Sequence, residues 1–462
     1  MTHVNRRSLK VQQNSFRKHA SNTDCYSIFN LLTSSDLFDQ VESLLPEHRE
    51  RLFPPTETLS MFVAQVLSQD RSCQNMVNQA VVKSLVYGLR PCSTHTGGYC
   101  KARQRLPLDM PKELAMFVGK SLAEEAPSSW HWQGRRVRVV DGTSVTMPDT
   151  EENQTVYPQQ GGQKPGLGFP ISRLLAITDL YSGAILDLAF GRFMGKGSDE
   201  QTLLRSLSGL FESGDIILGD AFFPTYLFIA EMLEKEVDIL MEQLGARRRT
   251  TDFKRGVSLG ERDHIIEISK PIKKPDWIEQ ARFDELPDTI AVREFTVKGK
   301  IMVTTLIDAK SYSKRELFAL YKRRWEIETN LGQIKTILGM NILSCRTPEM
   351  IAKEIWVYIL AYNLIRLLMA QSALMTGLRP TDLSFKHCLQ LWLNYLQQTT
   401  IMDRGAMEFL LTLMAQQRVA KRSGRIEPRA VKRRPKAYPL LVKPRAEARE
   451  LVQVNGHPKK LK

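Results

Sequence analysis

The chain has 462 residues, too many for one ordinary domain, so we expect about two to four domains. A hydrophobic share of 42% and a charged share of 25% exclude an intrinsically disordered chain. The net charge of +15 predicts a polyanionic partner, either a nucleic acid or an anionic membrane surface.

Neither a membrane span nor a secreted protein is expected. The most apolar run, 355–365, ends at Arg366, well short of the roughly 20 residues needed to cross a bilayer. The N-terminal residues lack the apolar stretch of a secretory signal. The six cysteines are scattered without a CxxC pair, which favours free thiols in a reducing cytosol over a structural zinc site.

Residues 1–130 are predicted to be mostly helical. Apolar residues recur at helical spacing over 56–85, a segment opened by two prolines with Thr56 as its expected cap. The stretch 92–106 is expected to be a polar, glycine-containing loop followed by a basic run. We expect a boundary between residues 127 and 134.

A series of strands and helices follows this boundary. Arg136–Val140 is a β-branched strand that is expected to end on Asp141, with Asp-Gly-Thr as a turn and 144–147 extended again. The remaining expected elements are strands at 173–178 and 184–190, a helix from Ser198 to Leu210 with a capping box to Gln201, a buried strand at 216–218 ending on Asp220, and a helix from Pro224 to about Glu236.

The second half of the chain does not continue this series of strands and helices. Region 239–310 contains alternating, β-branched segments (HIIEI, TIAVREFTV, IMVTTLI), which predict a β-rich insertion. A long helix is expected over 313–338 and a strongly apolar helix, packed on the sheet, over 351–375. From Arg418 to Arg445 eleven lysines and arginines face one acid, Glu427, which predicts an extended basic tail.

Four polar residues of the long helix share one side. Tyr321, Arg324, Glu328 and Lys335 are offset by 3, 7 and 14 residues from the first. At about 100° per residue the last three lie about 60°, 20° and 40° from Tyr321, so all four project from one narrow stripe. Such a stripe is unsuited to a core and suited to holding a metal ion beside a phosphodiester backbone.

Three carboxylates are candidates for a metal site. Two-metal phosphoryl transfer needs acids that converge on a pair of divalent ions, and Mg²⁺ prefers oxygen ligands. Asp141 and Asp220 each follow an apolar strand, and Glu328 would come from a packed helix. Arg324 and Lys335 would bind flanking phosphates, and Tyr321 would hydrogen-bond a phosphate oxygen.

These residues resemble the IS4 family of DDE transposases. That family's motif of Tyr, two residues, Arg, three residues, Glu, six residues, Lys matches Tyr321, Arg324, Glu328 and Lys335. Its first acid lies in a DGT-like segment, here Asp141, and its second in a Gly-Asp pair, here Asp220. The resemblance covers nearly the whole chain. It departs at 300–303, where some relatives carry a base-stacking tryptophan and this chain has none, so a hairpin route with base stacking is not implied.

The resemblance implies an α/β fold with an RNase H-like catalytic core and a β-rich insertion, plus a helical N-terminal domain and a basic C-terminal tail. The implied division is a DNA-binding domain at 1–130, a core at 131–238 and 311–375, an insertion at 239–310, and a helical region with the tail at 376–462. Asp141, Asp220 and Glu328 would be the catalytic metal ligands, and Tyr321, Arg324 and Lys335 the DNA contacts. Mg²⁺, with Mn²⁺ as a substitute, would be the cofactor.

The implied function is a cytoplasmic transposase that acts on double-stranded DNA. It would bind the terminal inverted repeats, cleave at the element ends and transfer the strands to target DNA, as a dimer in the DNA complex and with no membrane partner. Two alternatives stay open: an RNase H-like nuclease without strand transfer, and a catalytically silent DNA-binding regulator. Taken singly, each acid also has an ordinary interpretation, as a turn, cap or solvated helix residue.

Overall fold

The computed structural model describes residues 35–47, 53–86, 92–195, 197–398, 404–419 and 443–456. Within them the fold is mixed α/β, as expected, and is built on one nine-stranded sheet in the order β3-β2-β1-β4-β5-β9-β8-β7-β6. The strands are β1 (Val137–Thr146), β2 (Ile171–Asp179), β3 (Ile185–Arg192), β4 (Ile216–Gly219), β5 (Asp238–Glu242), β6 (Val257–Gly260), β7 (Asp263–Ser269), β8 (Thr289–Val297) and β9 (Lys300–Thr304).

The sheet has two parts that share β5. Strands β1, β2 and β3 form an antiparallel meander, and β4 and β5 then add parallel to β1. Strand β9 pairs antiparallel with β5, and β8, β7 and β6 follow it, so the predicted β-rich segments are strands that extend the same sheet. Strand β5 crosses the boundary expected at residue 238, because it pairs with β4 along its length.

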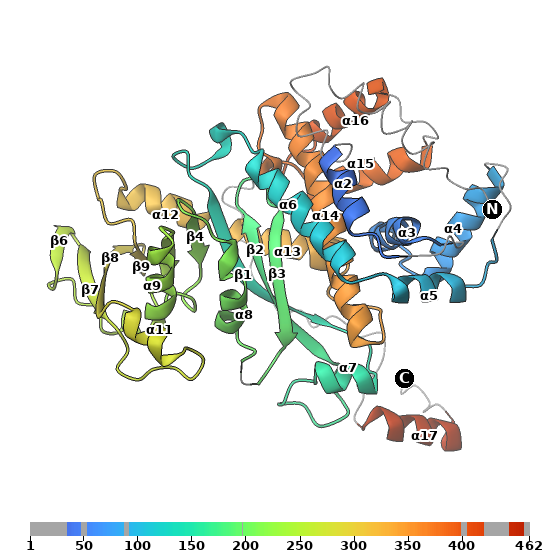
Figure 1. The fold of residues 1–462 in the computed structure, drawn as a ribbon, viewed down its shortest axis with the longest axis horizontal. Helices are drawn as coiled ribbons and strands as arrows, with labels where there is room; N and C mark the ends of the chain where they lie inside the picture. The colour runs from blue at the N-terminus through green and yellow to red at the C-terminus, as the bar shows by residue number, and fades with distance from the viewer. Residues whose placement is uncertain are drawn as a thin grey trace, which may run out of the picture.

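Helices cover both faces of the sheet and one end of the molecule (Figure 1). They are α2 (Ser35–Ser43), α3 (Pro55–Leu67), α4 (Cys73–Val86), α5 (Gly97–Arg105), α6 (Asp109–Glu124), α7 (Glu151–Val156), α8 (Glu200–Ser206), α9 (Tyr226–Glu234), α10 (Gly245–Arg248), α11 (Gln280–Glu285), α12 (Lys314–Lys322), α13 (Trp325–Gly332), α14 (Pro348–Thr376), α15 (Phe385–Gln398), α16 (Arg404–Gln416) and α17 (Arg445–Asn455).

Two hydrophobic cores lie on opposite faces of the sheet. One joins strand residues such as Val139 to helices α6, α13 and α14, and it also includes α3, α15 and α16. The other joins residues such as Val140 to α8, α9 and α11. Because neighbouring residues of a strand point to opposite faces, β1 delivers alternate side chains to two different sets of helices.

The apolar helix expected over 351–375 is α14, which is buried along nearly all of its length. It is the one helix in the described ranges that is long and apolar enough to cross a bilayer, and 89% of its most apolar window is buried within the protein. Asn363 of α14 accepts a hydrogen bond from the Ile185 amide and donates one to the Ile185 carbonyl. The helix therefore packs against β3, as a core helix does.

The N-terminal helices differ from the expectation in two places. The helical segment 56–85 is two helices, α3 and α4, because Asp70 accepts a bond from the Ser72 amide and turns the chain between them. The expected loop in 92–106 contains helix α5, whose Tyr99 is fully buried against Phe53. Tertiary packing here overrides the poor helix propensity of Gly97 and Gly98.

The predicted basic tail falls mainly on residues 420–442, which lie outside the described residues. Its two ends are described. Arg418 forms an isolated bridge with Leu383. Arg445 begins helix α17, pairs with Asp149 and lies over the Phe169 ring.

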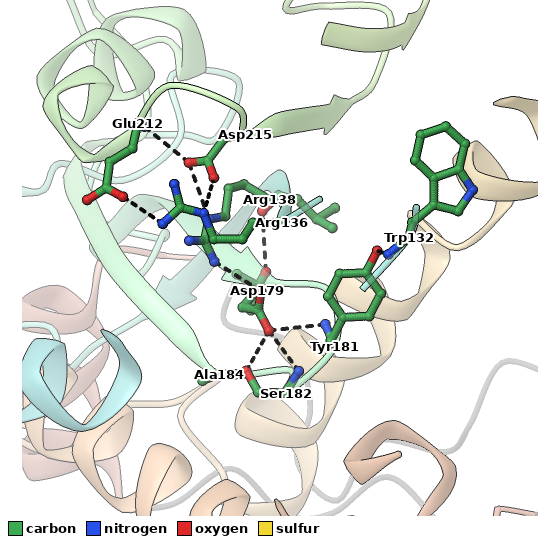
Figure 2. A network of polar contacts seen from close by, with 11 residues as sticks. Trp132, Arg136, Arg138, Asp179, Tyr181, Ser182, Ala184, Glu212 and Asp215 are labelled. Atoms are coloured by element: carbon green, nitrogen blue, oxygen red, sulfur yellow. Dashed lines mark hydrogen bonds and ion pairs between the residues drawn. The ribbon is translucent and has the colours of Figure 1, made fainter. Parts of the chain in front are cut away.

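A buried ion network fixes the starts of β1 and β4 (Figure 2). Arg138 forms ion pairs with Asp179 at 3.0 Å and Asp215 at 3.5 Å, and Arg136 pairs with Asp215 at 2.9 Å. Asp179 also accepts bonds from the Tyr181 and Ser182 amides in the turn between β2 and β3. The network thus ties together the starts of β1, which contains Asp141, and of β4, which is followed by Asp220.

Candidate active site

Asp141 lies within strand β1 rather than at its end. The expected Asp-Gly-Thr turn is wrong, because β1 pairs with β2 continuously and sets Asp141 opposite Ala176 and Thr143 opposite Leu174. Pairing with β4, however, stops at Val139. The carboxylate therefore stands where the neighbouring strand on that side has just ended, on the face of the sheet that α13 covers.

Asp220 follows the last residue of β4, as predicted. Val139 pairs with Leu218, so Asp141 and Asp220 each lie two residues beyond the last paired position of adjacent parallel strands. The Asp220 carboxylate accepts a 2.8 Å hydrogen bond from the amide of Phe222, which fixes the start of the following loop. The helix after this loop begins at Tyr226 with Thr225 as its cap, slightly later than expected.

The expected continuous helix over 313–338 is three segments. Helix α12 begins with the capping box of Ser313 and Glu316 and ends at Lys322, α13 begins at Trp325, and a π-helical turn, η5 (Gln333–Ile337), follows. A single 3.6-residue period therefore does not describe the whole stripe. Arg324 and Lys335 nevertheless both reach β1, at Asp141 and Thr143, and Glu328 is hydrogen-bonded to Arg324.

Arg324 links the two acids on this face of the sheet. Its guanidinium donates a 3.0 Å hydrogen bond to Glu328 and lies 3.8 Å from an Asp141 oxygen. The Arg324 side chain is 13% exposed and that of Glu328 is 37% exposed. Arg323, its neighbour, turns away to pair with Glu326 and lies over the Tyr181 ring. The break between α12 and α13 thus sends two adjacent arginines to different partners.

Lys335 and Tyr321 flank this pair. The Lys335 ammonium donates a 2.9 Å bond to the Thr143 hydroxyl on β1, and burial lowers the pKa of Lys335. Tyr321 is buried, and burial raises the pKa of its phenol while the nearby Arg324 guanidinium lowers it. The Lys300 ammonium lies 6.0 Å from the centre of the Tyr321 ring.

The site concentrates negative charge in a partly dry environment. Burial raises the pKa of Asp141 to about 6, and Glu328 and Asp220 add to the rise. Arg324 and a hydrogen bond from the Gly142 amide oppose it. Carboxylates that repel one another in a dry site favour a bound cation. In the described part of the chain, no three His, Cys, Asp or Glu side chains converge tightly enough to hold a metal ion, and the Arg324 guanidinium occupies the space between two of the acids.

The donor set nevertheless suits a divalent ion. Asp141 and Asp220 offer hard carboxylate oxygens at one level of the sheet, and Glu328 reaches the same guanidinium as Asp141. Mg²⁺ takes such ligands and keeps several waters of its own.

Comparison with known proteins identifies the family. A family model described as a transposase DDE domain matches residues 132–364, from just before β1 to the middle of α14. The chain belongs to the DDE transposase family. The match contains both strands that carry the aspartates and the whole α12–α13–η5 segment.

Relatives narrow the assignment. The transposase InsG of insertion sequence element IS4 from Escherichia coli K12 is 25% identical over 407 residues, which cover 86% of this chain and 89% of that protein. This DDE transposase is therefore of the IS4 type, as its motif indicates. A solved structure of the piggyBac transposase synaptic complex with hairpin DNA is also similar. The match covers 86% of this chain and 87% of the chain in that structure, at 10% sequence identity and a TM-score of 0.43.

Sequence reasoning missed one acid beside the site. Glu200 lies in the first turn of α8, where the expected cap Ser198 is replaced by Asp199. Acids are common in the first turn of any helix, so nothing in the sequence distinguishes Glu200. In the short helix α10, Arg247 pairs with Glu294 and Arg248 pairs with Glu242.

Proposed function

We propose that this transposase cleaves DNA at the ends of its element and transfers the strands to target DNA, with Asp141, Asp220 and Glu328 as the metal ligands. The observation that carries the proposal is the placement of Asp141 and Asp220 at one level of adjacent parallel strands, beside Glu328. The order of the strands, a three-strand meander followed by two parallel strands, supports an RNase H-like core.

The three acids would hold Mg²⁺, with Mn²⁺ as a substitute. When bound, the metal would activate the attacking water or 3′-hydroxyl and stabilise the leaving oxygen. The positively charged side chains of the protein would position the DNA phosphates. Arg324 offers a planar fork of donors for a phosphate once it leaves Glu328, and Lys335 offers a second charge about two turns beyond Glu328. Tyr321 is buried, and the Arg324 charge lowers the pKa of its phenol, which burial raises.

The remaining parts of the proposal follow the family. The DNA would include the terminal inverted repeats of the element, bound chiefly by the helical region before β1, and the active complex would be a dimer of the chain with two DNA ends. The net charge of +15 supports a large contact with phosphates. We propose that the enzyme acts in the cytoplasm.

The test uses the full chain and DNA that carries the inverted repeats flanking its gene. Asp141→Asn, Asp220→Asn and Glu328→Gln should each abolish strand cleavage and retain DNA binding, whereas the matched control Glu326→Gln, which loses only the Arg323 pair, should cleave. Full cleavage by Glu328→Gln would refute the site. Precleaved ends then separate a transposase from a nuclease, because only a transposase joins them to target DNA.

A further inference from the structure

The first turn of α8 presses an acid against the strand that carries Asp141. The turn is held by Asp199, which accepts a 3.0 Å bond from the Thr202 amide. A Cβ added to Gly142 would lie 2.3 Å from a carboxylate oxygen of Glu200. The Glu200 carboxylate therefore rests directly on the backbone of β1, at a place that only glycine leaves open.

The same turn is attached to the loop that carries the second aspartate. Gln201 donates a 2.7 Å bond to the Phe222 carbonyl, and the Phe222 amide donates to Asp220. Burial raises the pKa of Glu200, the Arg173 charge opposes the rise, and the Asp220 and Asp199 charges add to it. One helical turn thus joins Gly142 on β1 to Asp220 after β4.

Glu200 reaches the site from the opposite face of the sheet to Glu328. Gly142 follows Asp141 and so faces the α8 side, while Asp141 faces α13. Within the described ranges, the Glu200 carboxylate has no hydrogen bond or ion pair. Arg173, whose charge lowers the pKa of Glu200, donates instead to the Ser198 carbonyl at 3.4 Å and lies over the Phe193 ring.

We propose that Glu200 is a fourth acid of the catalytic centre and supplies carboxylate oxygen, directly or through a bound water, to the divalent cation beside Asp220. The proposal rests on the metal site proposed above. It explains why glycine stands next to Asp141, since any larger residue displaces the carboxylate. The competing role is that of an ordinary first-turn acid, which stabilises a helix but does not affect metal affinity.

The test is a titration of the full-length, DNA-free protein with Mn²⁺, followed by calorimetry or by the spin resonance of free Mn²⁺. Glu200→Gln should weaken Mn²⁺ binding about tenfold, the lower end of the loss typical when a supporting group is removed. Gly142→Ala should cause a similar loss, and the double variant should lose no more than either single one. The matched control is Glu151→Gln, which removes an exposed first-turn acid of α7.

Asp220→Asn in the same titration separates the role of Glu200 from the existence of the metal site. If Asp220→Asn weakens Mn²⁺ binding and Glu200→Gln leaves it unchanged, the role of Glu200 is refuted and the metal site stands. If neither variant changes the affinity, the metal site itself is refuted. Melting temperatures in metal-free buffer show whether each variant is folded, and Glu200→Gln, which keeps the shape of the side chain, decides the outcome if Gly142→Ala does not fold.

Discussion

Arg324 donates a 3.0 Å hydrogen bond to Glu328 one turn further along the chain. The same guanidinium lies 3.8 Å from Asp141, so it occupies the space between two acids that a divalent cation would have to enter. In the metal-free chain Arg324 is therefore an internal counter-ion. When Arg324 leaves the acids to contact a DNA phosphate, the divalent cation would take its place beside them.

Removing this counter-ion should strengthen metal binding. Arg324→Gln is expected to raise the affinity of the DNA-free protein for Mn²⁺ about tenfold, because a charge-assisted hydrogen bond worth roughly 1.5–3 kcal/mol no longer competes with the metal. Arg323→Gln is the control, since Arg323 pairs with Glu326 instead. Calorimetric titration checks both variants, and an unchanged or weaker affinity in Arg324→Gln would show that the guanidinium does not compete.

The raised pKa of Asp141 predicts how stability depends on pH. This pKa is about 6 in the folded protein and about 4 in an unfolded chain. Between these values the folded state binds more protons, so the free energy of unfolding falls as pH rises through the window. A shift of this size corresponds to about 3 kcal/mol. In metal-free buffer Asp141→Asn should therefore melt at a higher temperature than the unmodified protein at pH 7.5, with the difference closing toward pH 4.

Added Mg²⁺ provides the check on this interpretation. The ion should raise the melting temperature of the unmodified protein at pH 7.5 and have little effect on Asp141→Asn, because binding stabilises only the state that has the ligands. A melting difference that is the same at pH 4 and pH 7.5 would mean that the Asp141 charge is not what the substitution relieves.

Elements with a strong local signal could be predicted from the sequence. The period-two segments of the insertion are β7, β8 and β9, and the apolar run is α14. Where the local sequence did not distinguish a turn from a strand, pairing with a distant strand decided the structure. Whether Asp-Gly-Thr is a turn or a strand depends on a partner some 30 residues away, β2, which pairs through it.

The sequence suggested candidate site residues, but it could not predict how they lie relative to one another. The spacing from Tyr321 to Lys335 assumed one regular helix, and the side chains converge although the segment breaks at Arg324 and ends in a π-helical turn. The Arg324–Asp141 contact joins residues of two distant segments, and Glu200 has no spacing relation to any of the others. Contacts of this kind come from the fold and are invisible in local sequence.

The buried network at the starts of β1 and β4 (Figure 2) should be a main source of stability. Asp179 is 1% exposed and neutralises Arg138 while accepting the Tyr181 and Ser182 amides. Asp179→Ala removes one of the two carboxylates that pair with Arg138 and leaves two amides without this partner, so the free energy of unfolding should fall by about 3 kcal/mol, the lower end for a broken buried pair. Glu212→Ala, which removes a side chain that is 61% exposed, should cost less than about 1 kcal/mol. Urea unfolding of both variants measures the contrast, and equal losses would contradict it.

Lys335 should act through its charge rather than through the fold. Among the residues that the structure describes, it donates only to the Thr143 hydroxyl, a neutral group that water can serve equally well, so its ammonium is free to bind a phosphate. Lys335→Ala should weaken binding of element-end DNA and reduce the slope of log affinity against log salt by about 0.9, the value for one lost phosphate contact. Lys235, which donates to the Ser208 carbonyl at the other end of the sheet, is the matched control, and Lys235→Ala should leave the slope unchanged. Fluorescence anisotropy over a range of salt concentrations gives both slopes. If the slope for Lys335→Ala equals that of the unmodified protein, Lys335 does not bind phosphate, and its bond to Thr143 would be its whole role.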